Sequence, residues 1–279
     1  DITGAQLRTL LEQQWQPEGE SRPFLKLGLS DNVTYTFDPD AAKGSHITSV
    51  MVDGAPVDEA ATYTIASGSF LISGGDNFTV LGEGTDRKDS GLIDTDAFIN
   101  YFGARDVVEP DYRKQAVAIS GQPSELTEGE QVSFTASGFD MTSKGAPTTT
   151  EVEVFVGDTS VGTFPVTAGL IDGVPTRNGT ADISFTAPAG ITGDSTVRLV
   201  AAPSGTTASF PVTVTAADLQ AGNGVVHVID GVLLPDEPGP AVSGRRRGRT
   251  WLLVPIGIAA VAGLGGASHS HGGILLPVV

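Results

Sequence analysis

The feature of this sequence that most constrains its fold is a change of pattern at about Pro110. Before this point, segments with helical periodicity alternate with strand-like ones, whereas helical signals vanish from there to Ala216. Short alternating segments separated by turn residues fill the second region, at residues 115–119, 131–137, 151–156, 161–167, 180–186, 195–202 and 208–215. Strands of this length and spacing are typical of an immunoglobulin-like sandwich. We therefore predict an α+β N-terminal domain followed by an all-β immunoglobulin-like sandwich.

The N-terminal region begins with a predicted helix over residues 3–15. Thr3 followed by Gln6 forms a capping box, and the apolar side chains Leu7, Leu10, Leu11 and Trp15 then fall on one face. Strands are expected at residues 24–28, 33–38, 47–52 and 62–67, with a hairpin turn at Asp53-Gly54. A second helix is expected from Thr95 to about Phe102, with Phe98, Tyr101 and Phe102 facing inward.

These patterns divide the chain into four parts. We place the α+β domain at residues 1–108 and the sandwich at residues 113–216. Residues 217–238 form a further short piece, and residues 239–279 hold a Pro/Gly linker, an arginine run and an apolar tail.

The charge of the chain restricts its partners. The formal net charge is −17, so the protein repels phosphate backbones and nucleic acid is not an expected partner. A small nucleotide remains compatible with this charge, because local groups or metals can offset the bulk field. The absence of cysteine excludes disulfides, thiol catalysis and Cys-ligated metal sites.

Three segments of the first 103 residues, in order and spacing, resemble the C-terminal domain of the 5'-nucleotidase family, which includes UDP-sugar hydrolases. The first is Ile2–Leu7, leading into the helix, and the second is Arg22–Leu27 followed by Val33–Asp38. The third is Phe70–Phe78, containing Ser-Gly-Gly-Asp-Asn-Phe, followed by Asp89-Ser90-Gly91. The Gly-Gly-Asp-x-Phe element after a strand is the most specific of these.

The resemblance implies a nucleotide-recognition site. In the family the C-terminal domain clamps the nucleobase between two aromatic rings, and Phe24 and Phe78 match them by position. Glu83 is the nearest match to the acidic residue that holds the ribose hydroxyls, with Glu in place of the usual Asp. The expected substrate-binding residues are Phe24, Gly74, Gly75, Asp76, Asn77, Phe78 and Glu83.

The chemistry of these residues agrees with a ligand-binding role, but each of them also has a simpler structural explanation. Stacking on two phenyl rings contributes roughly 1–3 kcal/mol per base face, and glycines allow positive φ and close backbone approach. Against this, Phe24 lies in an apolar segment, where Phe is usually core. Gly74-Gly75 alone would be an ordinary turn, and Asp76 is better explained as a loop brace than as a catalytic acid.

No catalytic residue or metal ligand is assigned in this chain. In the family an N-terminal domain binds two divalent metal ions and performs the hydrolysis, using Asp-x-His and Gly-Asn-His segments that do not occur here. We therefore expect no cofactor in this chain, two divalent metal ions in a missing N-terminal domain, and an N-terminally truncated family match.

The C-terminal region suggests a surface location. Gly224–Pro235 resembles the closing strand of a fasciclin-type adhesion domain. Trp251–Ala267 holds 17 uncharged, mostly apolar residues, at the lower limit for a membrane-spanning helix and weakened by Pro255 and four glycines. A weak transmembrane anchor and a flexible tail therefore stay open as alternatives, and association with a membrane or cell wall would go through this tail.

Two functions follow. The first is the nucleotide-recognising part of a secreted or cell-surface bacterial 5'-nucleotidase-type phosphohydrolase. The alternative is a cell-surface adhesion or binding module with a vestigial nucleotidase domain. A large exposed apolar patch on residues 113–216 would favour the alternative.

Overall fold

The computed structural model describes residues 1–171, 174–217, 219–221, 224–226 and 273–275. By its contacts the chain divides into one unit of residues 1–217 with 271–279 and a second of residues 218–270. In the second unit the described residues form a two-stranded antiparallel hairpin of β15 (Leu219–Ala221) and β16 (Gly224–Val226). The predicted segments Trp251–Ala267 and most of Gly224–Pro235 lie outside the described residues. Within those residues, no helix has the length and apolar character needed to cross a membrane.

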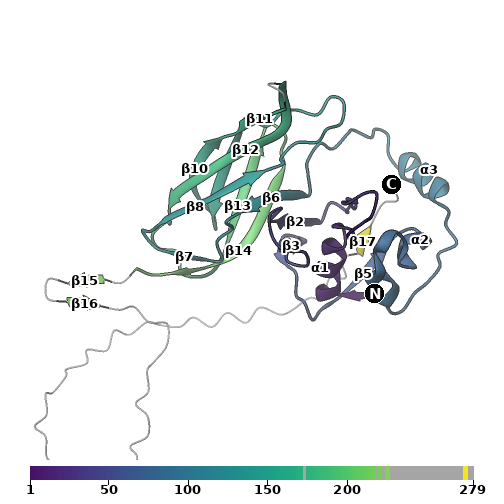
Figure 1. The fold of residues 1–279 in the computed structure, drawn as a ribbon, viewed down its shortest axis with the longest axis horizontal. Coiled ribbons are helices and arrows are strands. Elements are labelled where there is room, and N and C mark those ends of the chain that lie inside the picture. The colour runs from purple at the N-terminus through teal and green to yellow at the C-terminus, as the bar shows by residue number, and fades with distance from the viewer. Residues whose placement is uncertain (172–173, 218, 222–223, 227–272, 276–279) are drawn as a thin grey trace, which may run out of the picture. The chain divides into compact units, whose positions relative to one another are not determined.

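The N-terminal domain mixes helices and strands, as predicted (Figure 1). Its elements are β1 (Ile2–Thr3), α1 (Gly4–Glu12), β2 (Val33–Phe37), β3 (Ile47–Val52), β4 (Ala55–Pro56), β5 (Thr62–Ala66), α2 (Ser69–Ile72), the 3-10 turns η1 (Gly75–Asn77) and η2 (Thr79–Glu83), and α3 (Asp94–Gly103). The predicted strand 24–28 is the exception, since it is reduced to an isolated bridge between Trp15 and Phe24.

The first helix forms because the sequence caps it and gives it one apolar face. The Thr3 side chain accepts a hydrogen bond from the Gln6 backbone, and the Gln6 side chain accepts one from the Thr3 backbone, which confirms the capping box. Leu7, Leu10 and Leu11 are fully buried in the N-terminal core, together with apolar residues of β2, β3 and η2. The residues just after the helix, from Gln13 to Gln16, contact the loop of residues 74–79.

The second domain is a two-sheet sandwich with an immunoglobulin strand order. Its strands are β6 (Ala116–Ser120), β7 (Glu125–Thr127), β8 (Gln131–Ser137), β9 (Glu151–Val156), β10 (Thr159–Pro165), β11 (Thr167–Ile171), β12 (Val174–Thr186), β13 (Gly193–Ala202) and β14 (Thr207–Thr215). One sheet has the order β10-β9-β13-β14-β7, and the other contains β11-β12-β8-β6. These correspond to the CFG and ABED sheets of an immunoglobulin-like fold, with β7 added parallel to β14.

The sandwich core follows the predicted alternation. Inward side chains such as Val152, Val154, Val156 and Phe210 have no exposed area, while their neighbours along each strand are more exposed. Two phenylalanines of facing sheets, Phe134 and Phe210, meet edge to face with ring centroids 5.8 Å apart.

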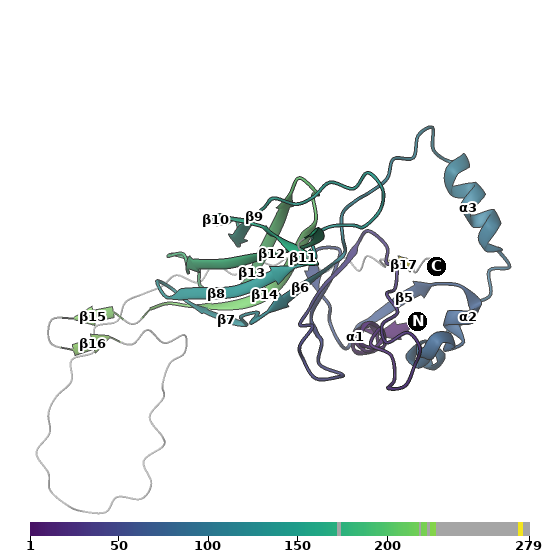
Figure 2. The ribbon, with the colours of Figure 1, turned by 45° about the horizontal axis from the view of Figure 1, so that its top comes forward.

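The two domains share a sheet, which the sequence did not reveal. Strand β6 pairs with β8 of the sandwich and, in parallel, with β2 of the N-terminal domain, so that seven strands run in the order β11-β12-β8-β6-β2-β3-β4. Side chains reinforce this junction: the hydroxyls of Thr36 and Thr48 both donate to Gln122 Oε1, at 2.7 and 2.9 Å. Figure 2 shows β6 and β8 from a second direction.

A smaller three-stranded sheet, in the order β1-β5-β17, completes the N-terminal domain. In it β17 (Gly273–Leu275), from the far end of the chain, pairs in parallel with β5.

Helix α3 forms where it was predicted, but its aromatic face is exposed and not buried. Phe98, Tyr101 and Phe102 were expected to face inward, and they are 65, 49 and 44% exposed. Every residue of α3 is exposed, because no other element of the described chain covers this helix. The apolar periodicity identified the helix, but it could not identify what the apolar face packs against.

Candidate functional site

The Phe24 side chain lies beside the end of the first helix. Backbone bonds from Gln16 N to Pro23 O (3.0 Å) and from Leu25 N to Gln14 O (2.8 Å) hold its segment there. The Phe24 ring meets Trp15 edge-on, with centroids 5.0 Å apart, and remains 39% exposed. Phe24 therefore lies at the surface, with its ring supported by Trp15, and is not a core residue.

The loop with the Gly-Gly-Asp-Asn sequence is tightly turned. Gly74 has φ +88°, in the left-handed region that favours glycine, and Asp76 and Asn77 also have positive φ. A Cβ at Gly75 would lie 2.6 Å from the tip of the exposed Phe70 ring, which would have to turn away. Gly74 thus serves the geometry of the turn, and Gly75 leaves room for the Phe70 ring.

Gln16 connects this loop to the Phe24 segment. Its Nε2 donates to the Asp76 carbonyl oxygen at 3.1 Å, and its Oε1 accepts from Asn77 Nδ2 at 2.8 Å. The Gln16 residue is only 7% exposed. The predicted brace was the Asp76 carboxylate, but that group instead lies 3.9 Å from the Arg22 guanidinium. The loop is thus held through its backbone and Asn77, and sequence reasoning missed Gln16 because nothing in the sequence links it to residues 60 positions away.

The structure places Phe78 differently from Phe24. Its side chain is 2% exposed and packs in the N-terminal core with Val80, Leu81 and the leucines of α1. Burial follows because the apolar face of α1 must be covered and this segment covers it. In this conformation Phe78 offers no open ring, so a clamp formed by Phe24 and Phe78 would need the Phe78 segment to open.

Glu83 is not brought to the same place. It is exposed, and one of its carboxylate oxygens lies 3.4 Å from Gln6 Nε2, near the start of α1. Phe24 and Gln16 lie beyond the other end of this helix, and at 1.5 Å rise per residue the two ends are about 13 Å apart. The predicted site therefore separates into a group at Phe24, Asp76 and Asn77, and a remote Glu83.

Lys26 belongs to the Phe24 segment, and Lys114 lies against Gly138 of the sandwich. Desolvation, with a smaller contribution from repulsion by Lys114, lowers the pKa of Lys26 to about 8. Desolvation also lowers the pKa of Lys114, against the attraction of Asp140. Arg22, two residues before Phe24, has a side chain 66% exposed and brings positive charge to this segment of an otherwise acidic protein.

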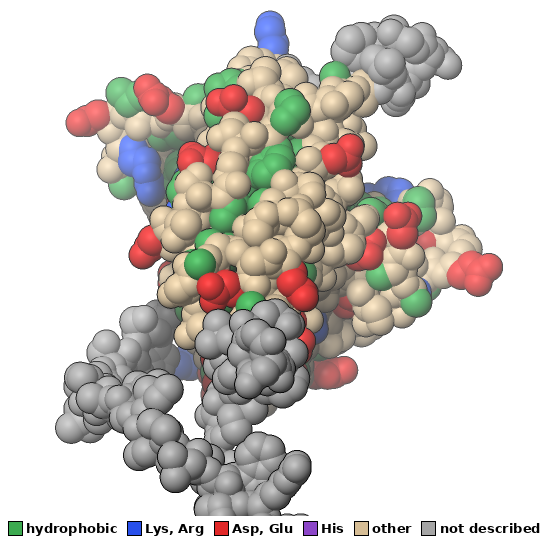
Figure 3. Space-filling view, turned by 90° about the vertical axis from the view of Figure 1, so that its left-hand side faces the viewer, with side chains coloured by type: hydrophobic (Ala, Val, Ile, Leu, Met, Phe, Trp, Pro, Cys, Tyr) green, Lys and Arg blue, Asp and Glu red, His purple; other side chains and the backbone are tan. Residues whose placement is uncertain are grey.

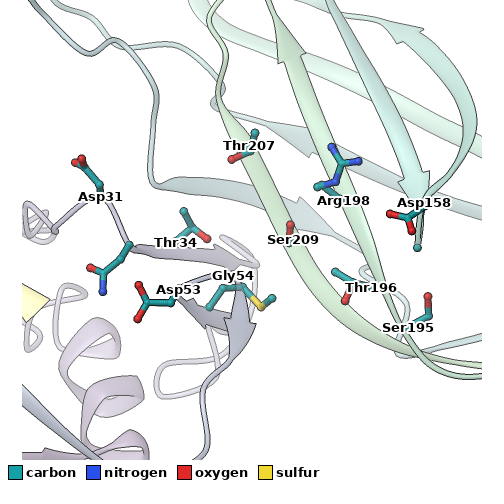
Figure 4. A pocket seen from close by; sticks show the side chains of 13 residues that line it. Asp31, Thr34, Asp53, Gly54, Asp158, Ser195, Thr196, Arg198, Thr207 and Ser209 are labelled. Atoms are coloured by element: carbon teal, nitrogen blue, oxygen red, sulfur yellow. The ribbon is translucent and has the colours of Figure 1, made fainter. Parts of the chain in front are cut away.

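A separate polar groove of about 720 Å³ lies where strands of the N-terminal domain and the sandwich meet (Figure 4). Its lining includes Asp31, Asp53, Asp158 and Arg198, together with neutral residues that are mostly Ser, Thr and Gly. Arg198 is held with its guanidinium carbon 4.0 Å from the Phe155 ring centroid. None of the predicted site residues lines this groove, which is assembled from segments too distant in sequence to form a motif.

The described residues contain no group of three or more His, Asp or Glu side chains placed to hold a metal ion. His46 is the histidine whose surroundings the structure shows: its Nδ1 lies 3.1 Å from a Glu12 oxygen, and its ring stacks on Trp15 at 4.1 Å. These contacts fix the end of α1 beneath Phe24.

Comparison with known proteins supports the resemblance over the first part of the chain. The family model described as "5'-nucleotidase, C-terminal domain" matches residues 1–83. A curated "5'-nucleotidase-related protein" of Glossina morsitans morsitans is 36% identical over 110 residues, which is 36% of this chain. The match spans only 20% of the length of that relative.

Among solved structures, the chain is similar to a crystal structure of an ICAM-5 D1–D4 ectodomain fragment. The similarity covers 41% of this chain and 28% of that one, with 18% sequence identity and a TM-score of 0.25. At that TM-score it carries no argument, and the immunoglobulin-like assignment rests on the strand order itself.

Proposed function

We propose, on the premise that residues 1–83 are a 5'-nucleotidase C-terminal domain, that this chain is the nucleotide-recognising part of a secreted or cell-surface phosphohydrolase. In this proposal the base of a nucleoside or nucleotide stacks on Phe24, next to the loop Gly74–Asn77. Hydrolysis itself, with two divalent metal ions, belongs to a catalytic domain elsewhere.

The observation that carries the proposal is the exposure of Phe24 on a rigid support. Trp15 backs the ring from one side, and Gln16 joins its segment to the Gly-Gly loop, so the ring is presented at little cost in conformational entropy. Aromatic rings stack on any base, at roughly 1–3 kcal/mol per base.

The neighbouring polar groups suit the rest of a nucleotide. Arg22, two residues before Phe24, has a side chain 66% exposed and could pair with a phosphate group. Asp76 and Glu20 offer carboxylate oxygens for sugar hydroxyls beside the same loop. Phe78 anchors the loop to the core, and it becomes a second stacking ring only where the segment opens.

The adhesion alternative gains no support from the sandwich. Among the described residues, the large hydrophobic side chains that are exposed all lie between positions 24 and 107, outside residues 113–216. On the face that Figure 3 shows, acidic side chains are scattered and the hydrophobic ones form a narrow strip. A protein-binding face would be expected to expose a larger contiguous apolar area.

Trp15 provides the test, because it contacts Phe24 directly. In the full chain with Trp251→Phe, Trp15 is the remaining tryptophan. Titration with adenosine and AMP should change its fluorescence saturably, with saturation-transfer NMR of the ligand as an absorbance-independent check. Phe24→Ala should weaken binding roughly 5- to 150-fold, the loss expected for one stacking contact.

The matched control is Phe98→Ala, which removes another exposed phenylalanine of the same domain. It should bind as the parent does. Binding by Phe24→Ala at parental affinity, or no binding by the folded parent chain, would contradict the proposal.

A further inference from the structure

Helix α3 carries a stripe of aromatic side chains, with an acidic residue at its start and a basic residue just past its end. Within α3, positions 94, 98, 101 and 102 follow the spacing of one helical face, and they are Asp94, Phe98, Tyr101 and Phe102. Arg105 lies two residues beyond the helix and is placed on this face by its contacts. The contacts confirm the shared face, since Phe98 and Phe102 rings are 4.6 Å apart. The Arg105 guanidinium carbon lies 3.8 Å from the Tyr101 ring centroid, and its Nη1 donates to the Tyr101 carbonyl oxygen.

This face is uncovered in the described chain. Phe98, Tyr101 and Phe102 are 65, 49 and 44% exposed, and α3 lies at the margin of its domain in both Figure 1 and Figure 2. A helix of 10 residues is marginal by itself in water, so packing of its apolar face is needed to hold it. Of the described residues, those between 92 and 107 hold most of the exposed large hydrophobic side chains.

We propose that this face binds the same face of a second copy of the chain, with the two α3 helices antiparallel about a twofold axis. The stripe is self-complementary in that arrangement and in no parallel one. Asp94 of one copy then lies opposite Arg105 of the other, at both ends, and Phe98 lies opposite Tyr101. Aromatic side chains are favoured at the centres of interfaces, with charged residues at the rim.

The length of α3 determines how strong a dimer can be expected. Ten residues span about 15 Å, and the face they present is smaller than the roughly 800 Å² per partner of a standard interface. The dimer is therefore weak and concentration-dependent. Neighbouring exposed residues such as Ile93 and Val107 extend the contact at its edges.

Sedimentation velocity of the full chain over a concentration series tests the pairing. The parent chain should pass from monomer to dimer as concentration rises, and Phe98→Asp should abolish the dimer. Asp94→Arg and Arg105→Asp should each weaken it, and the double variant Asp94→Arg/Arg105→Asp should restore it, because the exchange of charges recreates both ion pairs. Raised salt should weaken the parent and the double variant alike.

The control for Asp94→Arg is Asp96→Arg. It makes the same charge change in the first turn of the same helix, but on the opposite face, and it should leave the dimer intact. Circular dichroism of every variant checks that α3 and the fold persist.

Several results would overturn the proposal. One is a parent chain that stays monomeric at every concentration. If it then dimerises after removal of residues 241–270, which leaves β17 in place, the face is assigned to the chain's own C-terminal segment. Another is a double variant no better than the single ones. A third is binding of the chain to vesicles of phosphatidylcholine and phosphatidylglycerol, abolished by Phe98→Asp, with no dimer in solution. That result would assign the face to a membrane.

Discussion

Asn77 Nδ2 donates a hydrogen bond of 2.8 Å to Gln16 Oε1 across 61 positions of sequence. The same Gln16 donates through its backbone N to Pro23 O, next to Phe24, and through Nε2 to the Asp76 carbonyl. One nearly buried side chain thus sets the distance between the exposed ring and the Gly-Gly loop.

Gln16→Ala should weaken adenosine binding by releasing the loop from the Phe24 segment. Removing the three side-chain bonds, to the Gln13 carbonyl, the Asp76 carbonyl and Asn77, leaves part-buried partners with fewer hydrogen bonds, so the free energy of unfolding should also fall by about 1–3 kcal/mol. Gln13→Ala is the control, since Gln13 bonds Thr79 and Val80 further along the loop without reaching the Phe24 segment. Equal losses of affinity in the two variants, measured by the Trp15 titration, would make Gln16 a purely structural residue.

Gly4→Ala should destabilise the N-terminal domain strongly. A Cβ at Gly4 would lie 2.1 Å from the Asp58 backbone oxygen, and Gly4 N is itself bonded to Ala61 O, so the backbone on both sides would have to move. Overpacking of this kind costs typically 1–3 kcal/mol, and more where the obstacle is backbone. Gly103→Ala, with nothing within 4 Å, should be neutral or slightly stabilising in the same urea titration.

Local patterns predicted much of this fold because local physics determines it. The capping box at Thr3 and Gln6 set the start of α1, and alternation located β3, β8 and β9 with the observed bounds. The turn at Asp53-Gly54 has positive φ at both residues, as a tight hairpin between β3 and β4 requires.

Features that depend on distant segments could not be predicted in this way. The parallel pairing of β2 with β6 and the burial of Phe78 are decided by which surfaces meet in three dimensions. The family resemblance predicted that Phe24 and Phe78 form one aromatic clamp. The structure separates them into an exposed ring and a core ring, a distinction that periodicity around either residue does not make.

The shared sheet should couple the unfolding of the two domains. Val154→Ala, in the sandwich core, removes two methyl groups from a side chain with no exposed area and should cost about 1–3 kcal/mol. Because β6 belongs to both domains, the thermal transition reported by Trp15 in the Trp251→Phe background should move down with that of the sandwich. A Trp15 transition that stays in place while circular dichroism shows sandwich strands melting earlier would show that the domains unfold independently.

Tyr35 should make the protein lose stability in strong alkali. The residue is 2% exposed, and its hydroxyl lies 3.1 Å from Gln14 Nε2 and 3.2 Å from Gln14 Oε1. Desolvation, partly opposed by the hydrogen bond with Gln14, raises the pKa of this phenol from 10.0 to about 12. Below pH 10 both the folded and the unfolded chain keep the proton. Between pH 10 and 12 the unfolded chain gives it up while the folded chain holds it, so the free energy of unfolding falls as pH rises, by roughly 2–3 kcal/mol at most.

Tyr35→Phe should remove this part of the alkaline slope while costing about 0.5–1.5 kcal/mol at neutral pH for the lost hydrogen bond. Gln14 keeps its bonds to Leu11 O and Leu27 N, so the variant should fold. Lys26 is present in both proteins, and its lowered pKa makes stability rise between about pH 8 and 10.5, so the comparison is between the two slopes above pH 10. Tyr101→Phe, at an exposed position, is the control and should leave the slope of the parent unchanged. Parallel urea-unfolding curves for Tyr35→Phe and the parent from pH 10 to 12 would mean that the phenol titrates alike in the folded and unfolded chains, and that desolvation at this site does not hold its proton.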